Sequence, residues 1–379
     1  MMGKGIMYYL KFTSIEKIYF FIWTFYAVRR ILFDGSMLSQ YSFVENLYME
    51  FNASVVIMLV LLFILVRRYS RQRFIFSILC VLSIIFVIPG FYLQVGLLFA
   101  LIAPCINIEK LIRYDMKLKF VLLTIVVLLC EFGFIENKTG YVKGVYKQSL
   151  GFVNQNTLTW IVVHILLEWI FLSYGQIKVR QYIIIFAAMV AVSAASKGRT
   201  SLYTFGVVLV LFTLANWRPK IFYGRLSRIL FAVITPGMAA LCFLLSYLYK
   251  CGNTIAIKIN NMTTNRVRYA ADALSVYDLK LFAGIINRRG HRMQIDMSYI
   301  DIAVRSGMLF LILICLVCSV QFLKCLKQKR IDIALFILYF VISGFGENYM
   351  VHVAYNASIL YLLCPKEALT NEAGEKKYG

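Results

Sequence analysis

Charged residues are scarce in this chain of 379 residues. They make up 15% of it, whereas hydrophobic residues make up 61% and the mean hydropathy is +0.76. This composition excludes a soluble globular domain, in which about a quarter of the residues are charged. The sequence also has no low-complexity linker, no visible internal repeat and no polar stretch long enough for a soluble domain. We therefore expect a single membrane domain over residues 1–379.

Apolar runs of about 16 to 24 residues recur along the chain. Each can cross a hydrocarbon core of about 30 Å at a rise of about 1.5 Å per residue, and helices satisfy their own backbone in lipid. The fold class expected is an all-α polytopic bundle of about twelve transmembrane helices. A cleavable signal is not expected, because the first run carries Arg29 and Arg30 and no small-x-small site follows. The expected spans are 18–33, 51–66, 74–90, 92–108, 119–135, 156–174, 181–196, 200–216, 229–249, 298–323, 331–346 and 348–364.

Acidic residues are also few, at 18 against 40 lysines and arginines, which gives a net charge of +22. With twelve spans, the strongest basic clusters of the loops all fall on one side of the membrane. Short cytoplasmic loops carry the excess of lysine and arginine, so this side is expected to be the cytoplasm and to hold both termini. The charge then reflects topology and attraction to lipid headgroups, and nucleic acid is not an expected partner. The clusters are 67–73, 109–119, 178–180, 217–228 and 324–330.

Metal-binding and disulfide patterns are lacking. No cysteine, histidine or carboxylate cluster has metal-ligand spacing, so no metal or cofactor is expected. Of the nine cysteines only Cys251 falls in an expected external loop, which excludes an external disulfide within one chain. The C-x-x-C at 315–318 lies in an apolar helix, where packing is its commoner role.

Positive charges nevertheless occur on the expected outer face. One group is in the turn "SKGRT" between two spans, and the other is in the large external loop 250–297, the longest loop. Guanidinium groups bind phosphate or carboxylate oxygens with two parallel hydrogen bonds, so we expect an outward-facing site for a lipid-linked phosphate or pyrophosphate. The alternative is that each cation snorkels or neutralises a helix end. The loop cations are Lys250, Lys258, Arg266, Arg268, Lys280, Arg288, Arg289 and Arg292, and the candidate binding residues are Lys197, Arg199, Arg266, Arg268, Arg288 and Arg289.

Two further segments carry polar side chains at expected helix ends. "GFVNQNTLTW" (151–160) places Asn154 and Asn156 where they either cap a helix or bind sugar hydroxyls. "FGENYMVHVAYNASIL" (345–360) places Glu347 near Asn356. A carboxylate at membrane depth is a functional candidate by default. A salt bridge from Glu347 to an external arginine is an equal alternative, and both readings can hold together.

The order of these motifs resembles the bacterial Wzy-type O-antigen and exopolysaccharide (capsular) polysaccharide polymerases, which are related to the O-antigen ligases. The resemblance covers about residues 118–360. In the family the helix-opening motif is usually N-P-N, and here Gln155 replaces the proline. "SKGRT" matches through Arg199 and "TTNRVRYAADAL" through Arg266. "IDMSYI" matches through Asp296, at a position where ligases often carry histidine.

The resemblance implies a glycosyltransferase that needs no nucleotide sugar, metal or cofactor. It would join oligosaccharide repeat units carried on undecaprenyl pyrophosphate at the outer face of the bacterial cytoplasmic membrane. A flippase and a chain-length regulator of the same pathway would be partners. The expected base is Asp296, followed by Glu347 and His291. The expected binding residues are Arg199 and Arg266, supported by Lys197, Arg268, Arg288, Arg289, Asn154, Asn156 and Asn356.

Two other functions stay open. A ligase would share nearly every motif and differ in its acceptor, although aspartate in "IDMSY" favours a polymerase. A flippase for lipid-linked oligosaccharides would be expected to carry charges at mid-depth and to have related halves, whereas here the halves differ. A structural or assembly protein of the same pathway is a more remote alternative.

Overall fold

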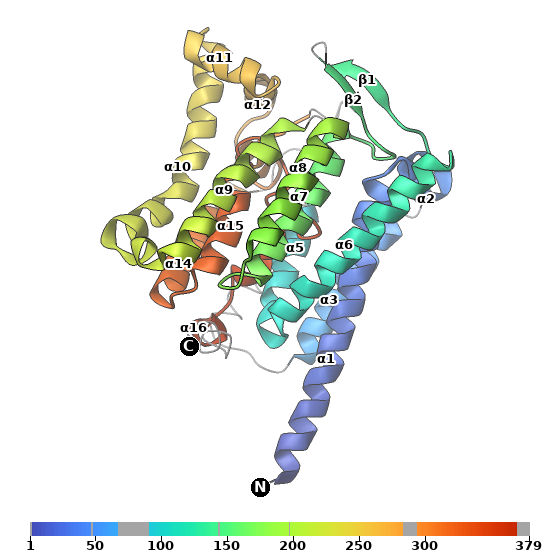
Figure 1. Ribbon diagram of the computed structural model, residues 1–379, viewed down its shortest axis with the longest axis vertical. Coiled ribbons are helices and arrows are strands. Elements are labelled where there is room, and N and C mark those ends of the chain that lie inside the picture. The colour runs from blue at the N-terminus through green and yellow to red at the C-terminus, as the bar shows by residue number, and fades with distance from the viewer. Residues whose placement is uncertain are drawn as a thin grey trace. The chain divides into compact units, whose positions relative to one another are not determined.

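The computed structural model describes residues 2–46, 48–66, 91–142, 145–196, 198–282 and 294–369 (Figure 1). The expected span 74–90 and the predicted site residues Lys197, Arg288, Arg289 and His291 lie outside the described residues. The chain divides into two compact units. One comprises Met1–Tyr69 with Leu101–Gly206, and the other Ser70–Ala100 with Val207–Gly379. The expectation of a single domain stays a prediction.

The first unit is helical apart from one short hairpin. Helix α6 ends at this hairpin and α7 follows it, so the two helices run antiparallel and pack closely (Figure 1). Asparagines start both helices, since the side chain of Asn107 accepts from Lys110 N at 2.9 Å and that of Asn154 from Asn156 N at 2.8 Å. The elements are α1 (Met2–Val28), the π-helix η1 (Arg29–Asp34), η2 (Met37–Gln40), α2 (Ser42–Asn46), α3 (Tyr48–Leu65), η3 (Ala103–Cys105), α6 (Ile108–Glu131), β1 (Thr139–Val142), β2 (Val145–Gln148), α7 (Gln155–Leu172), α8 (Val179–Ser196) and the start of α9 (Arg199–Trp217).

The second unit is built around α10, which packs on α14 and also on α12. At the end of α10 the chain folds back through the short helices α11 and α12 (Figure 1). The apolar α15 is buried along its length among the other helices. The elements are most of α5 (Phe91–Ile102), η4 (Pro219–Tyr223), α10 (Arg225–Lys250), α11 (Thr254–Met262), α12 (Arg266–Val276), α13 (Ser298–Arg305), α14 (Met308–Lys327), α15 (Ile331–Ser343), η5 (Ala357–Tyr361) and α16 (Lys366–Leu369).

Five of the described helices are long and apolar enough to cross a membrane: α7, α8, α9, α10 and α14. Three shorter apolar helices lie at Ala53–Leu65, Tyr92–Cys105 and Ile331–Ser343. On α8 large apolar side chains face outward, including Val179 at 76%, Ile183 at 64% and Phe186 at 69% exposed. Such a surface is unfavourable in water and suits lipid. The described chain thus has the features of a helical membrane protein.

Three expectations about the helices need correction. No continuous helix spans 348–364; the chain there makes turns and the 3₁₀ helix η5, and nearly every side chain is buried by protein. Non-helical backbone is tolerated at membrane depth when protein buries it, so hydropathy alone misassigned this segment. The expected span 298–323 is broken at Gly307, whose φ of 101° separates α13 from α14. The loop expected at 109–119 is the first part of α6.

Candidate functional site

The long loop at 250–297 positions Arg266 through a tight turn. Thr264 and Asn265 have φ values of 57° and 66°, and this left-handed pair reverses the chain between α11 and α12. Asn260 fixes the turn, because its Oδ1 accepts from Arg268 N at 2.9 Å and its amide donates to Asn265 Oδ1 at 3.2 Å. Arg266 therefore begins α12 at a defined position, and only 5% of it is exposed.

Arg266 is paired with Glu347, which follows α15 in the turn at 344–350. Arg266 Nη2 lies 2.9 Å from Glu347 Oε1, and the two side chains are only 6% and 4% exposed. The backbone of Glu347 is held as well, because its N–H donates to Ser343 O and its carbonyl accepts from Ser298 Oγ at 2.5 Å. This pair is the salt bridge to an external arginine that the sequence left open as an alternative. Among the described residues, Arg266 Nη1 has no hydrogen-bond partner.

Asp296 supplies a second carboxylate to this site. It precedes α13, is partly exposed, and accepts from Gln294 Nε2 at 3.0 Å. Burial lowers the pKa of Arg266, but the negative charges of Glu347 and then Asp296 outweigh burial, so the pKa of this guanidinium lies above its usual value. The centre therefore consists of one buried guanidinium and two carboxylates, one enclosed and one open to solvent.

The start of α13 links these groups. Ser298 N donates to Gly344 O at 2.9 Å, and Ser298 Oγ accepts from Met350 N at 3.3 Å, which ties "IDMSYI" to the turn that carries Glu347. One turn further, Arg305 Nε lies 2.5 Å from Asp301 Oδ1. Ser298 and this pair were missed in the sequence. Only the i,i+4 spacing of Asp301 and Arg305 could have signalled the pair.

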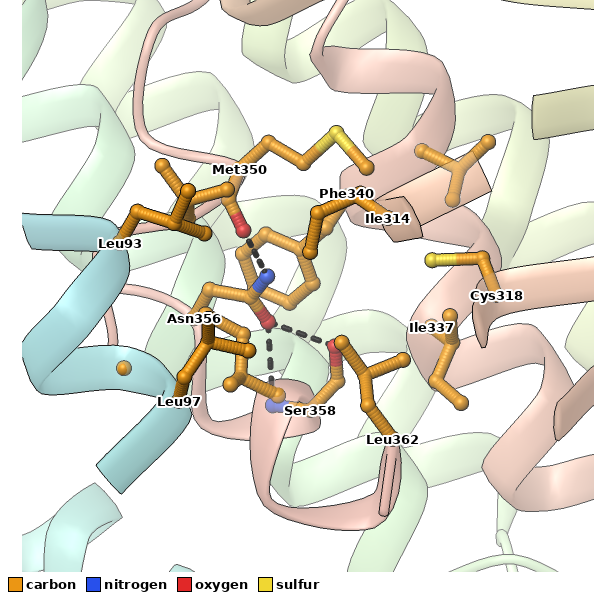
Figure 2. Close-up of a pocket in the computed structure, with 14 residues that line it drawn as sticks. Leu93, Leu97, Ile314, Cys318, Ile337, Phe340, Met350, Asn356, Ser358 and Leu362 are labelled. Carbon is orange, nitrogen blue, oxygen red and sulfur yellow. Dashed lines mark hydrogen bonds between the residues drawn. The ribbon is translucent and has the colours of Figure 1, made fainter. Parts of the chain in front are cut away.

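The side chain of Asn356 forms hydrogen bonds within its own turn. Figure 2 shows its amide nitrogen donating to Met350 O, at 2.5 Å, and its oxygen accepting from both Ser358 N and Ser358 Oγ. The cavity beside it measures about 20 Å³ and is lined mainly by apolar side chains such as Leu93 and Phe340. That volume is about enough for one water molecule. These contacts explain Asn356 structurally, and its predicted role toward substrate stays a prediction.

The remaining predicted residues are placed as follows. Asn154 is the N-cap of α7, as one of the two alternatives expected, and Asn156 lies in the first turn. The side chain of Arg268 is half exposed. Its Nε lies 3.8 Å from Asp272 Oδ2, and its guanidinium lies over the ring of Tyr269. Arg199 is the first residue of α9 and belongs to the first unit, whereas the Arg266 centre belongs to the second.

No group of three or more histidine, cysteine, aspartate or glutamate side chains is arranged as metal ligands in the part of the chain that the structure describes. The fold and the centre define a helical membrane protein with a buried arginine and two carboxylates near the turn at 344–350. No protein-family model matches the chain, and neither curated proteins nor solved structures give a match.

Proposed function

We propose that this protein is a polysaccharide polymerase of about twelve spans in a bacterial cytoplasmic membrane. It would join oligosaccharide repeat units carried on undecaprenyl pyrophosphate at the outer face, with both termini in the cytoplasm. The observation that carries the proposal is the buried Arg266–Glu347 pair, whose guanidinium is also acted on by the charge of Asp296. Three motifs of the resemblance, far apart in the sequence, thereby contribute to one centre in the second unit.

The chemistry assigns a different task to each group. The bond between the anomeric carbon and the pyrophosphate oxygen breaks, and the leaving group keeps the electron pair and gains negative charge. Arg266 Nη1 is buried and has no hydrogen-bond partner among the described residues, so it would donate to a phosphate oxygen when the site opens to admit the substrate. Glu347 would hold the guanidinium in place through Nη2.

Asp296 suits the role of general base. Its carboxylate is partly open to solvent, so an acceptor hydroxyl can reach it, whereas Glu347 is enclosed. The proton of that hydroxyl would pass to Asp296 as its oxygen attacks the anomeric carbon of the growing chain.

The direct test is a gel of surface polysaccharide and lipid-linked oligosaccharides from cells that lack the protein. A polymerase predicts single repeat units that face outward and are still attached to lipid. Full-length polymer left on its lipid carrier would instead indicate a ligase, and single units retained on the cytoplasmic face would indicate a flippase.

The same gel tests the centre itself. Arg266→Ala and Asp296→Asn should each abolish long polymer in cells where the variant is present in the membrane at the normal amount. Arg199→Ala, which tests the resemblance outside this centre, should abolish long polymer as well. Lys258→Ala is the matched control, because Lys258 is an exposed cation of α11 in the same loop. Normal polymer from Arg266→Ala would contradict the proposed phosphate contact.

A further inference from the structure

A second group of ionisable side chains is buried in the first unit, between α6 and α7. Asp115, Lys119 and His164 are 0% exposed and Glu168 is 1% exposed. Helix α7 is one of the helices apolar enough to cross a membrane. Burying a charge at such depth costs free energy, so ionisable residues there are usually paired with other groups or have a functional role. None of the motifs assigned to the proposed function includes these residues.

Lys119 lies between the two carboxylates. Its Nζ is 2.6 Å from Asp115 Oδ2 and also donates to Glu168 Oε1. The other oxygen of Asp115 accepts a hydrogen bond, because Trp23 Nε1 of α1 donates to Asp115 Oδ1 at 2.8 Å. In the described chain neither Asp115 Oδ2 nor Glu168 Oε2 has a hydrogen-bond partner, but Asp115 Oδ2 lies in the ion pair with Lys119. Both oxygens of Asp115 therefore contact a donor nitrogen, whereas only Oε1 of Glu168 does.

The charges of this cluster do not balance if every carboxyl group is ionised. One ammonium against two carboxylates leaves one negative charge enclosed by protein, and an enclosed uncompensated charge is strongly destabilising. Binding one proton removes that cost. The proton does not belong on Asp115, because a proton there would break its ion pair with Lys119 at Oδ2, while Oδ1 accepts from Trp23 Nε1.

Nor does the proton belong on His164. This imidazole lies one helical turn before Glu168 on α7, and burial and then the positive charge of Lys119 oppose a positive charge on it. Helix α8 also packs on α7 but has no acid or base between Ile183 and Ser196, and α1 contributes the indole of Trp23. The groups that act on Glu168 are thus Lys119 and Asp115, both from α6.

We propose that Asp115, Lys119 and Glu168 form a buried proton-binding site in which Glu168 holds the proton while Asp115 and Lys119 remain an ion pair. The ligand of this site is a proton, which Glu168 can exchange without breaking the pair. The site belongs to the first unit and is independent of the proposed polymerase chemistry, because nothing in it requires a substrate.

Infrared spectroscopy of the full-length protein in lipid nanodiscs tests the proposal at neutral pH. A protonated carboxyl group gives a C=O stretching band distinct from those of carboxylate and amide, and the band shifts in D₂O once the proton exchanges. The wild-type protein should show this band and Glu168→Gln should lack it. Glu131→Gln, which changes an exposed glutamate at the end of α6, should retain it.

Asp115→Asn makes the sharpest variant, because it leaves Glu168 intact. Without the Asp115 charge, Lys119 and Glu168 balance each other, so Glu168 should ionise and the band should disappear. A glutamate protonated merely because it is buried would keep the band in this variant, and that result would overturn the proposal. A wild-type protein with no such band, or a band that survives Glu168→Gln, would overturn it as well.

Discussion

Arg266 and Glu347 form an ion pair that is buried from water. The pair therefore affects the stability of the protein as well as its proposed chemistry. Removing one partner leaves the other charged and enclosed, at a cost of about 3–5 kcal/mol. Replacing both by apolar residues of similar size removes that cost. We therefore expect Glu347→Leu to lower thermal stability strongly, and the double variant Arg266→Met with Glu347→Leu to recover most of it.

The recovered double variant should still make no long polymer, because it lacks the guanidinium that we propose contacts phosphate. Thermal unfolding of the purified variants and the polymer gel together separate the two roles. Long polymer from the stable double variant would show that the pair serves packing alone.

Gly198 in "SKGRT" is fixed by close packing against α7. A Cβ at this position would lie 2.9 Å from Thr159 Cβ and closer still to its hydroxyl group. Gly198→Ala should therefore destabilise the protein by about 1–3 kcal/mol through overpacking. Gly206→Ala in α9 is the matched control, since nothing lies within 4 Å of its Cβ and the change should stabilise the helix by about 0.5–1 kcal/mol. Equal melting temperatures for both variants would contradict this packing argument.

At the scale of elements, substitutions of Asn154 at the start of α7 distinguish helix capping from sugar recognition. Asn154→Ala should cost about 1 kcal/mol, because the side chain that accepts from Asn156 N is lost. Asn154→Asp keeps a good N-cap acceptor but removes the amide donor. If Asn154 only caps the helix, Asn154→Asp will have the melting temperature and the polymer length of the wild-type protein. Restored stability with shortened polymer would assign the amide a role toward the sugar.

Hydropathy predicted the positions of most helices, because a long apolar run in lipid has few alternatives to a helix. It failed at 348–364, where burial comes from the surrounding protein and Asn356 bonds its own turn. It also missed the break at Gly307, which depends on a single residue with positive φ. For the site, the structure contains a salt bridge from Glu347 to an arginine of the 250–297 loop, which was one of the two alternatives that the sequence left open. The arginine is Arg266 because the turn that Asn260 holds places it there. The hydrogen bonds of Asn260 follow no periodic sequence pattern, so the sequence could not predict this contact.

At the scale of the whole molecule, the distribution of lysine and arginine predicts which loops face the cytoplasm. This orientation decides whether the Arg266 centre can meet an outward-facing lipid-linked substrate at all. The described cysteines provide a direct test, because Cys251 is exposed at the end of α10 whereas Cys105, Cys130, Cys242, Cys315, Cys318, Cys325 and Cys364 are buried.

A membrane-impermeant maleimide applied to intact cells should label the wild-type protein at Cys251, and Cys251→Ser should lose this labelling. Lys327 ends α14 on the expected cytoplasmic side and is exposed, so it provides the matched position. In the Cys251→Ser background, Lys327→Cys should react only in inverted membrane vesicles. The external loop would then lie on the side where lipid-linked repeat units are joined. Labelling of Lys327→Cys in intact cells would reverse the orientation and exclude an outward-facing Arg266 centre, whatever its chemistry.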